Sequence, residues 1–265
     1  MVAFLSLNLM LNTNKKIIVI VPCYNESGAI ASVLKAFPHK ELAHLKWNIE
    51  ILVVDNNSTD CTGDIARKHG ASVLVEYVQG KGNALLSGLR AVPDDADYIV
   101  MLDGDNTYKP REIIRMIEPL DSGFADAILG SRIQGKIKAG SMGATSRIGN
   151  WLFSFLVRSF YQVNVTDVLT GYFSWKKTAL DKMLPHITST GFEIEMEMIT
   201  KMARLGMDVY SVPISYHPRI GTSKLNHYKD GAAIFGTFLA NLNWSPDDND
   251  SSRPEPYRAF SPKTA

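Results

Sequence analysis

Short apolar runs alternate with amphipathic segments over the first half of this chain of 265 residues. Runs such as IIVIV and ILVV are apolar at every position, which is typical of strands buried on both faces of a parallel sheet. The expected strands are residues 16–21, 50–54, 71–76, 98–102 and 127–130. The segments between them have helical periodicity and predict helices at 27–36, 62–69, 82–91 and 111–120. This alternation implies right-handed βαβ units, so we expect an α/β fold with a Rossmann-like, mostly parallel sheet flanked by helices.

The alternation stops beyond residue 132. Residues 134–146 are polar and glycine-rich and predict a flexible loop, which is followed by helices at 147–161 and 192–205 and a strand at 209–214. The expected organisation is a lead at 1–15, a folded domain at 16–230, a short apolar helix at 231–244 and a tail at 245–265. The lead lacks the charge and cleavage site of a signal peptide. The tail is rich in Asp, Ser and Pro and is expected to be disordered.

The predicted helix at 147–161 has a narrow polar stripe, formed by Arg147, Asn150, Ser154 and Arg158. Aromatic and aliphatic side chains cover the rest of its surface. So wide an apolar face fits a helix lying in a membrane interface, but a helix of the core has the same periodicity, and both interpretations stay open. Segment 231–244 allows the same two placements and is shorter than the ~20 residues that span a bilayer.

Composition limits the partners and the compartment. The formal net charge is +1, so the chain has no global field for nucleic acid, and we expect no nucleic-acid partner. The two cysteines, Cys23 and Cys61, form neither a disulfide framework nor a C-x-x-C motif. This usage favours a reducing compartment, so we expect a cytoplasmic protein that is soluble or lies on a membrane surface.

The strand at 98–102 runs directly into Asp103, Gly104 and Asp105. Ligands bind at the carboxyl ends of strands in open α/β sheets, and two carboxylates there are costly unless a cation neutralises them. Mg²⁺ typically takes one or two carboxylates together with phosphate oxygens of a substrate. Short acidic pairs are also common in solvated turns, but Asp55 ends a second predicted strand. The pattern therefore favours a divalent metal that carries phosphates.

Two further segments place polar groups near the same edge of the sheet. VPCYNE (21–26) follows the first strand and DNNSTD (55–60) the second, although such residues also cap helices and form turns. QGKGN (79–83) precedes the third helix, where glycines and a helix N-terminus can approach a phosphate. It is neither a Walker A loop nor a G-x-G-x-x-G motif, so alone it is a weak signal.

Several motifs occur in order: VPCYNE, VVDNNSTD, QGKGNALLSGL, LDGDNTYKP, ILGSR, DVLTGYFSW, GFEIEMEM and PRIGTSKL. Over residues 16–230 they resemble the family-2 glycosyltransferases of the GT-A fold. The similarity is greatest to the branch that transfers a sugar from a nucleotide-sugar to dolichyl or another polyprenyl phosphate. That branch includes dolichol-phosphate mannose synthases, and LDGDNTY with the following GSR resembles archaeal members that begin N-glycan assembly.

The resemblance implies a role for each matching residue. The residues implied in nucleotide-sugar binding are Pro22, Tyr24, Glu26, Asp55, Lys81 and Asp103. Those implied in holding Mg²⁺ or Mn²⁺ are Asp103, Asp105 and Thr107, the last a weaker ligand than the Gln of mannose synthases. Those implied at the acceptor phosphate are Arg132, Arg147, Arg219, Ser223 and Lys224. Catalytic roles are implied for Asp105, Arg132, Arg219 and Glu197. Glu197 matches the acid of the family's F-Q-x-E segment, although Ile194 and Glu195 replace the usual Phe-Gln.

The implied chemistry is metal-dependent, inverting sugar transfer to a polyprenyl phosphate, for protein N-glycosylation or glycolipid assembly at the cytoplasmic face of a membrane. A phosphate acceptor is already anionic at pH 7, so it needs orientation and cations more than a base. UDP-GlcNAc and UDP-hexoses are favoured donors, and the Q-x-x-R-W motif of processive synthases is absent from the sequence. One alternative is a soluble or protein hydroxyl acceptor with Glu197 as the base. Another is a nucleotide-sugar-binding protein with weak catalysis, which is suggested by Thr107 at the position of a stronger metal ligand. A nucleotidyltransferase is less favoured, since its G-x-G-T-R-like loop is missing.

Overall fold

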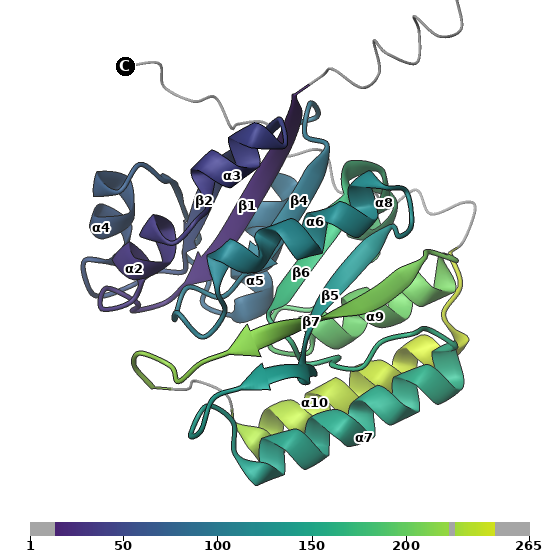
Figure 1. Cartoon of the computed structure of the whole chain (residues 1–265). Helices are drawn as coiled ribbons and strands as arrows, with labels where there is room; N and C mark the ends of the chain where they lie inside the picture. Colours follow the sequence, from purple (N-terminus) through teal and green to yellow (C-terminus); the bar gives the residue numbers. More distant parts are fainter. Residues whose placement is uncertain (1–13, 223–225, 247–265) are drawn as a thin grey trace, which may run out of the picture.

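The computed structural model describes residues 14–222 and 226–246. Its strands form a seven-stranded sheet in the order β3-β2-β1-β4-β6-β5-β7 (Figure 1). The strands are β1 (Lys15–Cys23), β2 (Trp47–Asp55), β3 (Ser72–Val75), β4 (Tyr98–Leu102), β5 (Ala127–Ile137), β6 (Tyr172–Lys176) and β7 (Val209–Tyr216). Only β6 runs antiparallel to its neighbours, β4 and β5, within this sheet. The predicted α/β class with a mostly parallel sheet is therefore confirmed.

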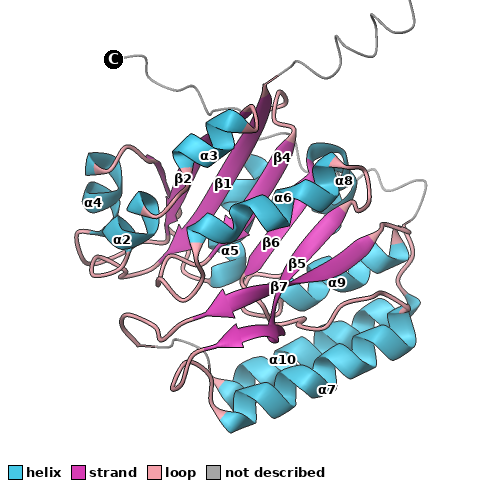
Figure 2. Ribbon diagram, in the orientation of Figure 1, coloured by secondary structure: helices cyan, strands magenta, loops and turns pink. Residues whose placement is uncertain are grey.

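Helices cover both faces of the sheet (Figure 2). They are α2 (Ile30–Lys35), α3 (His39–His44), α4 (Thr62–Lys68), α5 (Lys81–Arg90), α6 (Ile113–Asp121), α7 (Ala144–Tyr161), α8 (Lys177–Met183), α9 (Ile194–Arg204) and α10 (His227–Ala240). Alternate residues of each central strand point to opposite faces. In β1, Ile18 and Ile20 pack in the core under α5, α8 and α9, whereas Ile17 and Val19 pack in the core under α2, α4 and α6.

The loop expected at 134–146 is shorter in the structure and covers only residues 138–143, so its predicted bounds are wrong. β5 continues to Ile137, and α7 already begins at Ala144. The outer part of β5 pairs with β7 after a register shift between Ser131 and Lys136. Gly135 lies so close to the backbone of Ile214 that a Cβ atom would clash with it. The glycine that suggested a flexible loop thus permits a tight strand contact at a bulge.

Helix α7 buries part of its polar stripe and exposes much of its apolar surface. Its polar residues Asn150 and Ser154 are buried, whereas Trp151 is 56% exposed and Phe160 is also 56% exposed. Only part of the apolar face packs inward, where the hydroxyl of Tyr161 donates a hydrogen bond of 2.6 Å to the carbonyl oxygen of Phe238 in α10. The core-helix interpretation therefore fits one side of α7 and not its aromatic outer face.

The apolar segment predicted at 231–244 forms α10, which begins earlier, at His227, and is followed by a 3-10 turn at Asn241–Asn243. The side chain of Asn226 caps the helix by accepting hydrogen bonds from the backbone of Tyr228 and Lys229. Among the described helices, none combines the length and apolar character needed to cross a membrane. The lead up to residue 13 and the tail from residue 247 lie outside the described residues.

Candidate functional site

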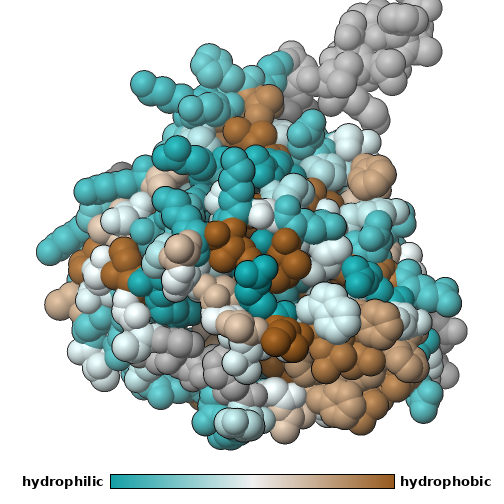
Figure 3. All heavy atoms as spheres, turned by 60° about the horizontal axis from the view of Figure 1, so that its bottom comes forward, coloured by the Kyte–Doolittle hydropathy of each residue, from teal (hydrophilic) through white to brown (hydrophobic). Residues whose placement is uncertain are grey.

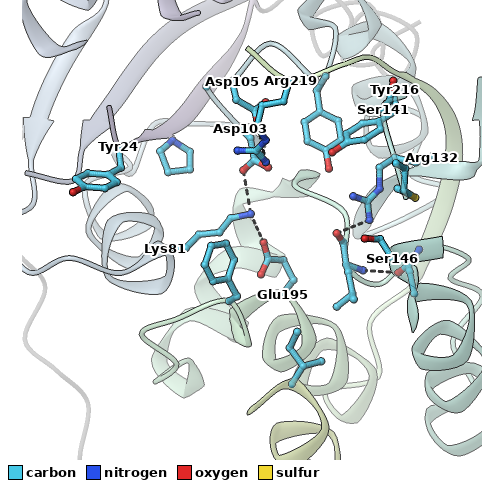
Figure 4. A pocket seen from close by; sticks show the side chains of 18 of the residues that line it. Tyr24, Lys81, Asp103, Asp105, Arg132, Ser141, Ser146, Glu195, Tyr216 and Arg219 are labelled. Carbon is cyan, nitrogen blue, oxygen red and sulfur yellow. Dashed lines mark hydrogen bonds and ion pairs between the residues drawn. The ribbon is translucent and has the colours of Figure 1, made fainter. Parts of the chain in front are cut away.

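A cleft of about 620 Å³ opens at the carboxyl ends of β1, β2 and β4, which are adjacent strands (Figure 4). The strand tips contribute Pro22 at the end of β1, Tyr24 and Glu26 after β1, Asn56 after β2, and Asp103 to Asp105 after β4. The other wall comes from α5, β5, α9 and the residues after β7. Phe153 of α7 and Ile234 of α10 line its apolar end. The cleft therefore carries charged side chains at the sheet edge and both polar and apolar side chains beside the two outer helices.

The Asp103–Asp105 pair is built into a turn at the end of β4. Asp105 is buried, and its Oδ1 accepts hydrogen bonds from the backbone nitrogen of Thr107 at 3.0 Å and from its hydroxyl at 2.6 Å. Its Oδ2 lies 2.8 Å from Nη2 of Arg219, within ion-pair distance but without hydrogen-bond geometry. Burial, and then the charge of Asp103, raise the pKa of Asp105, while Arg219 and Thr107 act in the opposite direction.

This pair fits a divalent metal that also binds phosphate. Oδ2 of Asp105 is a buried acceptor with no hydrogen-bond donor in the described structure, and Asp103 also faces the cleft. No group of three His, Cys, Asp or Glu side chains suited to a metal occurs among the described residues. Carboxylate ligands would thus number about two, which is typical of Mg²⁺ held jointly by protein and phosphate oxygens. Thr107 does not line the cleft, since its hydroxyl is directed to Asp105.

Lys81 lies at the start of α5 between two acids. Its Nζ is 3.1 Å from Oδ1 of Asp103 and 2.6 Å from Oε1 of Glu195, and it lies 5.8 Å from the ring centre of Phe192. Burial disfavours the ammonium, but Asp103 and Glu195 outweigh it and raise the pKa of Lys81 above its ordinary value. Burial raises the pKa of Glu195, which Lys81 partly offsets. Lys81 is therefore a permanent cation in the wall of the cleft.

The glycines around Lys81 have a different use from the one that the sequence suggested. Gly80 has a φ of +147°, a conformation that L residues rarely adopt. A Cβ atom on Gly80 or Gly82 would clash with the backbone of Ser189 and Thr190. These glycines let the start of α5 pack closely against the segment before α9, and this contact brings Lys81 next to Glu195.

Two arginines reach the cleft from the other half of the sheet. Arg132, on β5, is buried and makes a bidentate pair with Asp167, with Nε–Oδ2 at 2.8 Å and Nη2–Oδ1 at 2.7 Å. Its guanidinium carbon lies 5.2 Å from the ring centre of Tyr216. Arg219 follows β7 and faces the carboxylates of β4. Burial opposes its charge, but Asp105 and Asp103 raise the pKa of Arg219.

Other residues with expected roles either do not line the cleft or lie outside the described residues. Asp55 accepts a hydrogen bond of 3.0 Å from the backbone of Ser58 and does not line the cleft, and Arg147 is exposed on α7. Ser223 and Lys224 lie outside the described residues. Their expected roles therefore stay predictions.

Glu197 also lies outside the cleft lining. Its carboxylate accepts hydrogen bonds from the backbone of Thr188 and Ser189 and lies 2.7 Å from Nζ of Lys201. Although burial alone would raise the pKa of Glu197, the bonds from Lys201 and Ser189 lower it. Glu195, two residues earlier, is the acid that faces the cleft. Had the F-Q-x-E pattern been aligned from Phe192 instead of Ile194, its acidic position would have been Glu195.

Other groups, which the sequence patterns did not single out, also shape the cleft. Tyr108 is buried in its lining, and its hydroxyl oxygen accepts a 2.6 Å hydrogen bond from the backbone nitrogen of Gly171. Ser141 has a buried hydroxyl for which the described structure provides no partner. Asp167 belongs to the motif DVLTGYFSW, but only the folded structure shows that its carboxylate binds the guanidinium of Arg132.

A Rossmann-like sheet with strand-end carboxylates beside cationic side chains is the arrangement expected of the GT-A fold. The chain aligns over 88% of its length, with a TM-score of 0.66 and 20% identity, with 82% of glucosyl-3-phosphoglycerate synthase of Mycobacterium tuberculosis, solved with Mn²⁺, UDP and glucosyl-3-phosphoglycerate. This likeness confirms the GT-A fold.

The family follows from the sequence comparisons. Residues 18–184 match the family model described as Glycosyl transferase family 2. The chain is 33% identical to the glycosyltransferase AglJ of Haloferax volcanii over 227 residues, which cover 84% of this chain and 71% of that protein. It is 31% identical to the dolichyl-phosphate hexose transferase of the same organism, over 82% of this chain and 89% of that protein. The chain therefore belongs to glycosyl transferase family 2 and is a glycosyltransferase, as its motifs indicated.

Proposed function

We propose that this glycosyltransferase moves a sugar from a nucleotide-sugar to the phosphate of a polyprenyl lipid, with Mg²⁺ or Mn²⁺ and with inversion at the anomeric carbon. One observation carries the proposal: a single cleft joins the strand-end carboxylates, the cations Lys81, Arg132 and Arg219, and apolar side chains that include Phe153 of α7 and Ile234 of α10. A phosphate on a hydrocarbon chain needs that combination. The similarity to the dolichyl-phosphate hexose transferase of Haloferax volcanii supports it.

The end of the cleft at β4 would take the donor. Asp103 and Asp105 would hold the metal, which supplies positive charge against the diphosphate that leaves. Lys81 would lie beside that diphosphate, and its charge does not depend on pH near neutrality. Arg219 faces the same carboxylates and can donate to phosphate oxygens in their place.

The side of the cleft at β5 would take the acceptor. Arg132 would orient the acceptor phosphate, with the unpartnered hydroxyl of Ser141 as a further donor on the same side (Figure 4). Because this phosphate is already a nucleophile at neutral pH, its attack needs no base. An α-linked nucleotide-sugar would give a β-linked lipid product by direct displacement. The hydroxyl-acceptor alternative is weaker, since Glu197, its base, does not line the cleft.

The acceptor would reach the cleft from a membrane surface. The outer faces of α7 and α10 form an apolar patch (Figure 3). Its exposed residues are Ile148, Trp151, Leu152, Phe155, Phe160, Phe235 and Leu239. The patch carries aromatic side chains and borders the exposed Arg147 and Arg158, which suits an interface with anionic headgroups. We place this face on the cytoplasmic leaflet, with the apolar end of the cleft next to the lipid.

A phase-partition assay tests this function. Purified protein would be mixed with dolichyl phosphate, Mg²⁺ or Mn²⁺, and labelled UDP-GlcNAc, UDP-glucose or GDP-mannose in separate reactions, each with an EDTA control. Transfer of label to the organic phase, abolished by EDTA, is the expected result, with a UDP-sugar as the best donor. Label that stays aqueous with every donor would rule out the lipid acceptor for these sugars.

A further inference from the structure

We propose that Asn150 is a positioning residue through which helix α7 fixes the orientation of Arg132. This inference rests on the proposed function, in which Arg132 orients the acceptor phosphate. Asn150 does not bond to Arg132 itself. It acts through the carboxylate of Asp167 and the backbone of Leu169, which bind both side chains.

Asp167 is the centre of this arrangement. It is fully buried, and its Oδ2 accepts hydrogen bonds from the backbone nitrogen of Arg132 at 2.7 Å and from Nε of Arg132 at 2.8 Å. Its Oδ1 accepts from Nη2 of Arg132 at 2.7 Å and from Nδ2 of Asn150 at 2.8 Å. Each oxygen therefore has two donors, which satisfies a buried carboxylate.

Leu169 closes the arrangement on its other side. Its carbonyl oxygen accepts from Nη2 of Arg132 at 2.5 Å, and its backbone nitrogen donates to Oδ1 of Asn150 at 3.1 Å. Asn150 thus donates to Asp167 and accepts from Leu169 at the same time. A neutral amide can do both, whereas an ionised carboxylate cannot donate and an alanine can do neither.

These hydrogen bonds fix the direction in which the guanidinium of Arg132 points. Its Nε and Nη2 are committed to Asp167 and Leu169, and the described structure shows no hydrogen bond from its Nη1. The guanidinium is planar, so fixing two nitrogens also fixes the third. Nη1 is then the nitrogen of Arg132 that is left for a phosphate in the cleft, and a rotation of the pair with Asp167 would misdirect it.

Helix α7 offers a matched control for this role. Ser154 is one turn further along the same buried stripe, and its hydroxyl accepts a hydrogen bond of 3.2 Å from the backbone of Val168. It therefore anchors α7 to the same segment as Asn150 does, but the described structure gives it no hydrogen bond to Asp167 or Arg132. Asn150→Ala and Ser154→Ala both remove a buried hydrogen bond of α7, but only Asn150 belongs to the Arg132 arrangement, and only Asn150 also lines the cleft.

Steady-state kinetics on dolichyl phosphate vesicles with the favoured donor test the inference. We expect Asn150→Ala to raise the acceptor KM at least tenfold with an unchanged donor KM, while Ser154→Ala changes either KM less than twofold. Equal effects of the two variants, or an equal rise of both KM values for Asn150→Ala, would overturn it. Wild-type protein without lipid-linked product would instead refute the proposed function, so the two failures are distinguishable.

A second variant covers the case in which Asn150→Ala does not fold. In Asn150→Asp the new carboxyl can donate to Asp167 only when it is protonated. We expect the acceptor KM of this variant to rise steeply with pH between pH 5 and 8, relative to the wild type, while its donor KM follows the wild-type profile. A parallel pH dependence of both proteins would overturn the inference.

Discussion

The two sides of the cleft use ion pairs in different ways. On the side of β4, Lys81 and Arg219 pair with carboxylates that also line the cleft, and the side chains keep 16% and 30% of their surface exposed. On the side of β5, Arg132 pairs with Asp167, which is fully buried and outside the cleft lining. Pairs of the first kind can exchange partners with a metal and a diphosphate. The second kind is a permanent support that leaves one nitrogen of Arg132 for a ligand.

The largest expected effect is that of Asp105→Asn. Losing a charged metal ligand should reduce lipid-linked sugar formation by about 100- to 1000-fold, as for the loss of a preorganised electrostatic group. The pKa of Asp105 is raised, so its ionised form is disfavoured in the fold, and the variant should be at least as stable as the wild type at pH 7. Product counting and urea unfolding check both statements.

The exposed pair of Asp64 and Arg67 on α4 supplies the control for this variant. Asp64→Asn should change neither turnover nor stability measurably, since such surface pairs contribute about 0–1 kcal/mol. If Asp105→Asn kept wild-type turnover, the metal assignment would be lost together with the distinction between exchangeable and permanent pairs.

Asp167→Asn is expected to lower the stability of the fold, in contrast to Asp105→Asn. Removing this partner leaves Arg132 buried without a counter-charge, and the unfolding free energy should fall by about 3 kcal/mol. Asp181→Asn, which breaks the exposed pair with Lys177, should lower it by less than about 0.5 kcal/mol. Urea denaturation of the three proteins gives the comparison. Equal stability of Asp167→Asn and wild type would mean that the pair on the side of β5 is as replaceable as those near β4.

A smaller effect is expected on the outer face of α7. Trp151→Ser removes an exposed aromatic side chain whose burial in a lipid interface contributes about 1.5–3 kcal/mol, so vesicle binding should weaken about tenfold or more. Phe124→Ser, at an exposed position elsewhere, is the control. Co-sedimentation with vesicles that contain anionic lipid measures binding. Turnover on a detergent-solubilised acceptor should stay unchanged, and identical vesicle binding of both variants would argue against this face as the membrane surface.

The sequence predicted which strand ends carry the acids on the β4 side of the cleft, because each acid directly follows its strand in the chain. Continuous apolar runs mark β1, β2 and β4, and the acids follow directly at the strand ends. The β5 side of the cleft depends on contacts between distant segments. Arg132 and Asp167 are 35 residues apart, and β6, inserted antiparallel between β4 and β5, has no apolar run that distinguishes it from a loop. The hydrophobic periodicity of a sequence does not indicate which distant residues form an ion pair or which strands are neighbours.

Helix α9 shows the same limit of sequence-based prediction within a single helical turn. The segment EIEMEM contains Glu193, Glu195 and Glu197, and helical residues two apart face different directions. The sequence shows that acids are present but not which one faces Lys81. That choice is fixed by the contact of Gly80 and Gly82 with the 189–190 backbone, which brings α5 next to α9.

The smallest effect on turnover is expected for Glu197→Gln, and it is the variant that separates the two acids of α9. Glu197 holds the 188–189 segment and Lys201, so its loss should lower the unfolding free energy by about 1–3 kcal/mol while turnover falls less than threefold. Glu195→Gln should instead raise the donor KM about tenfold or more, because Glu195 positions Lys81.

The pH dependence of the unfolding free energy distinguishes the role of Glu197 further. The pKa of Glu197 is lowered from its ordinary 4.5 in the fold, so its contribution is complete above that value and disappears as the pH falls through the lowered pKa. Urea unfolding between pH 3 and 6 should therefore show a loss of stability in the wild type that is reduced in Glu197→Gln. A Glu197→Gln enzyme with unchanged pH dependence but abolished turnover would restore Glu197 as a catalytic residue.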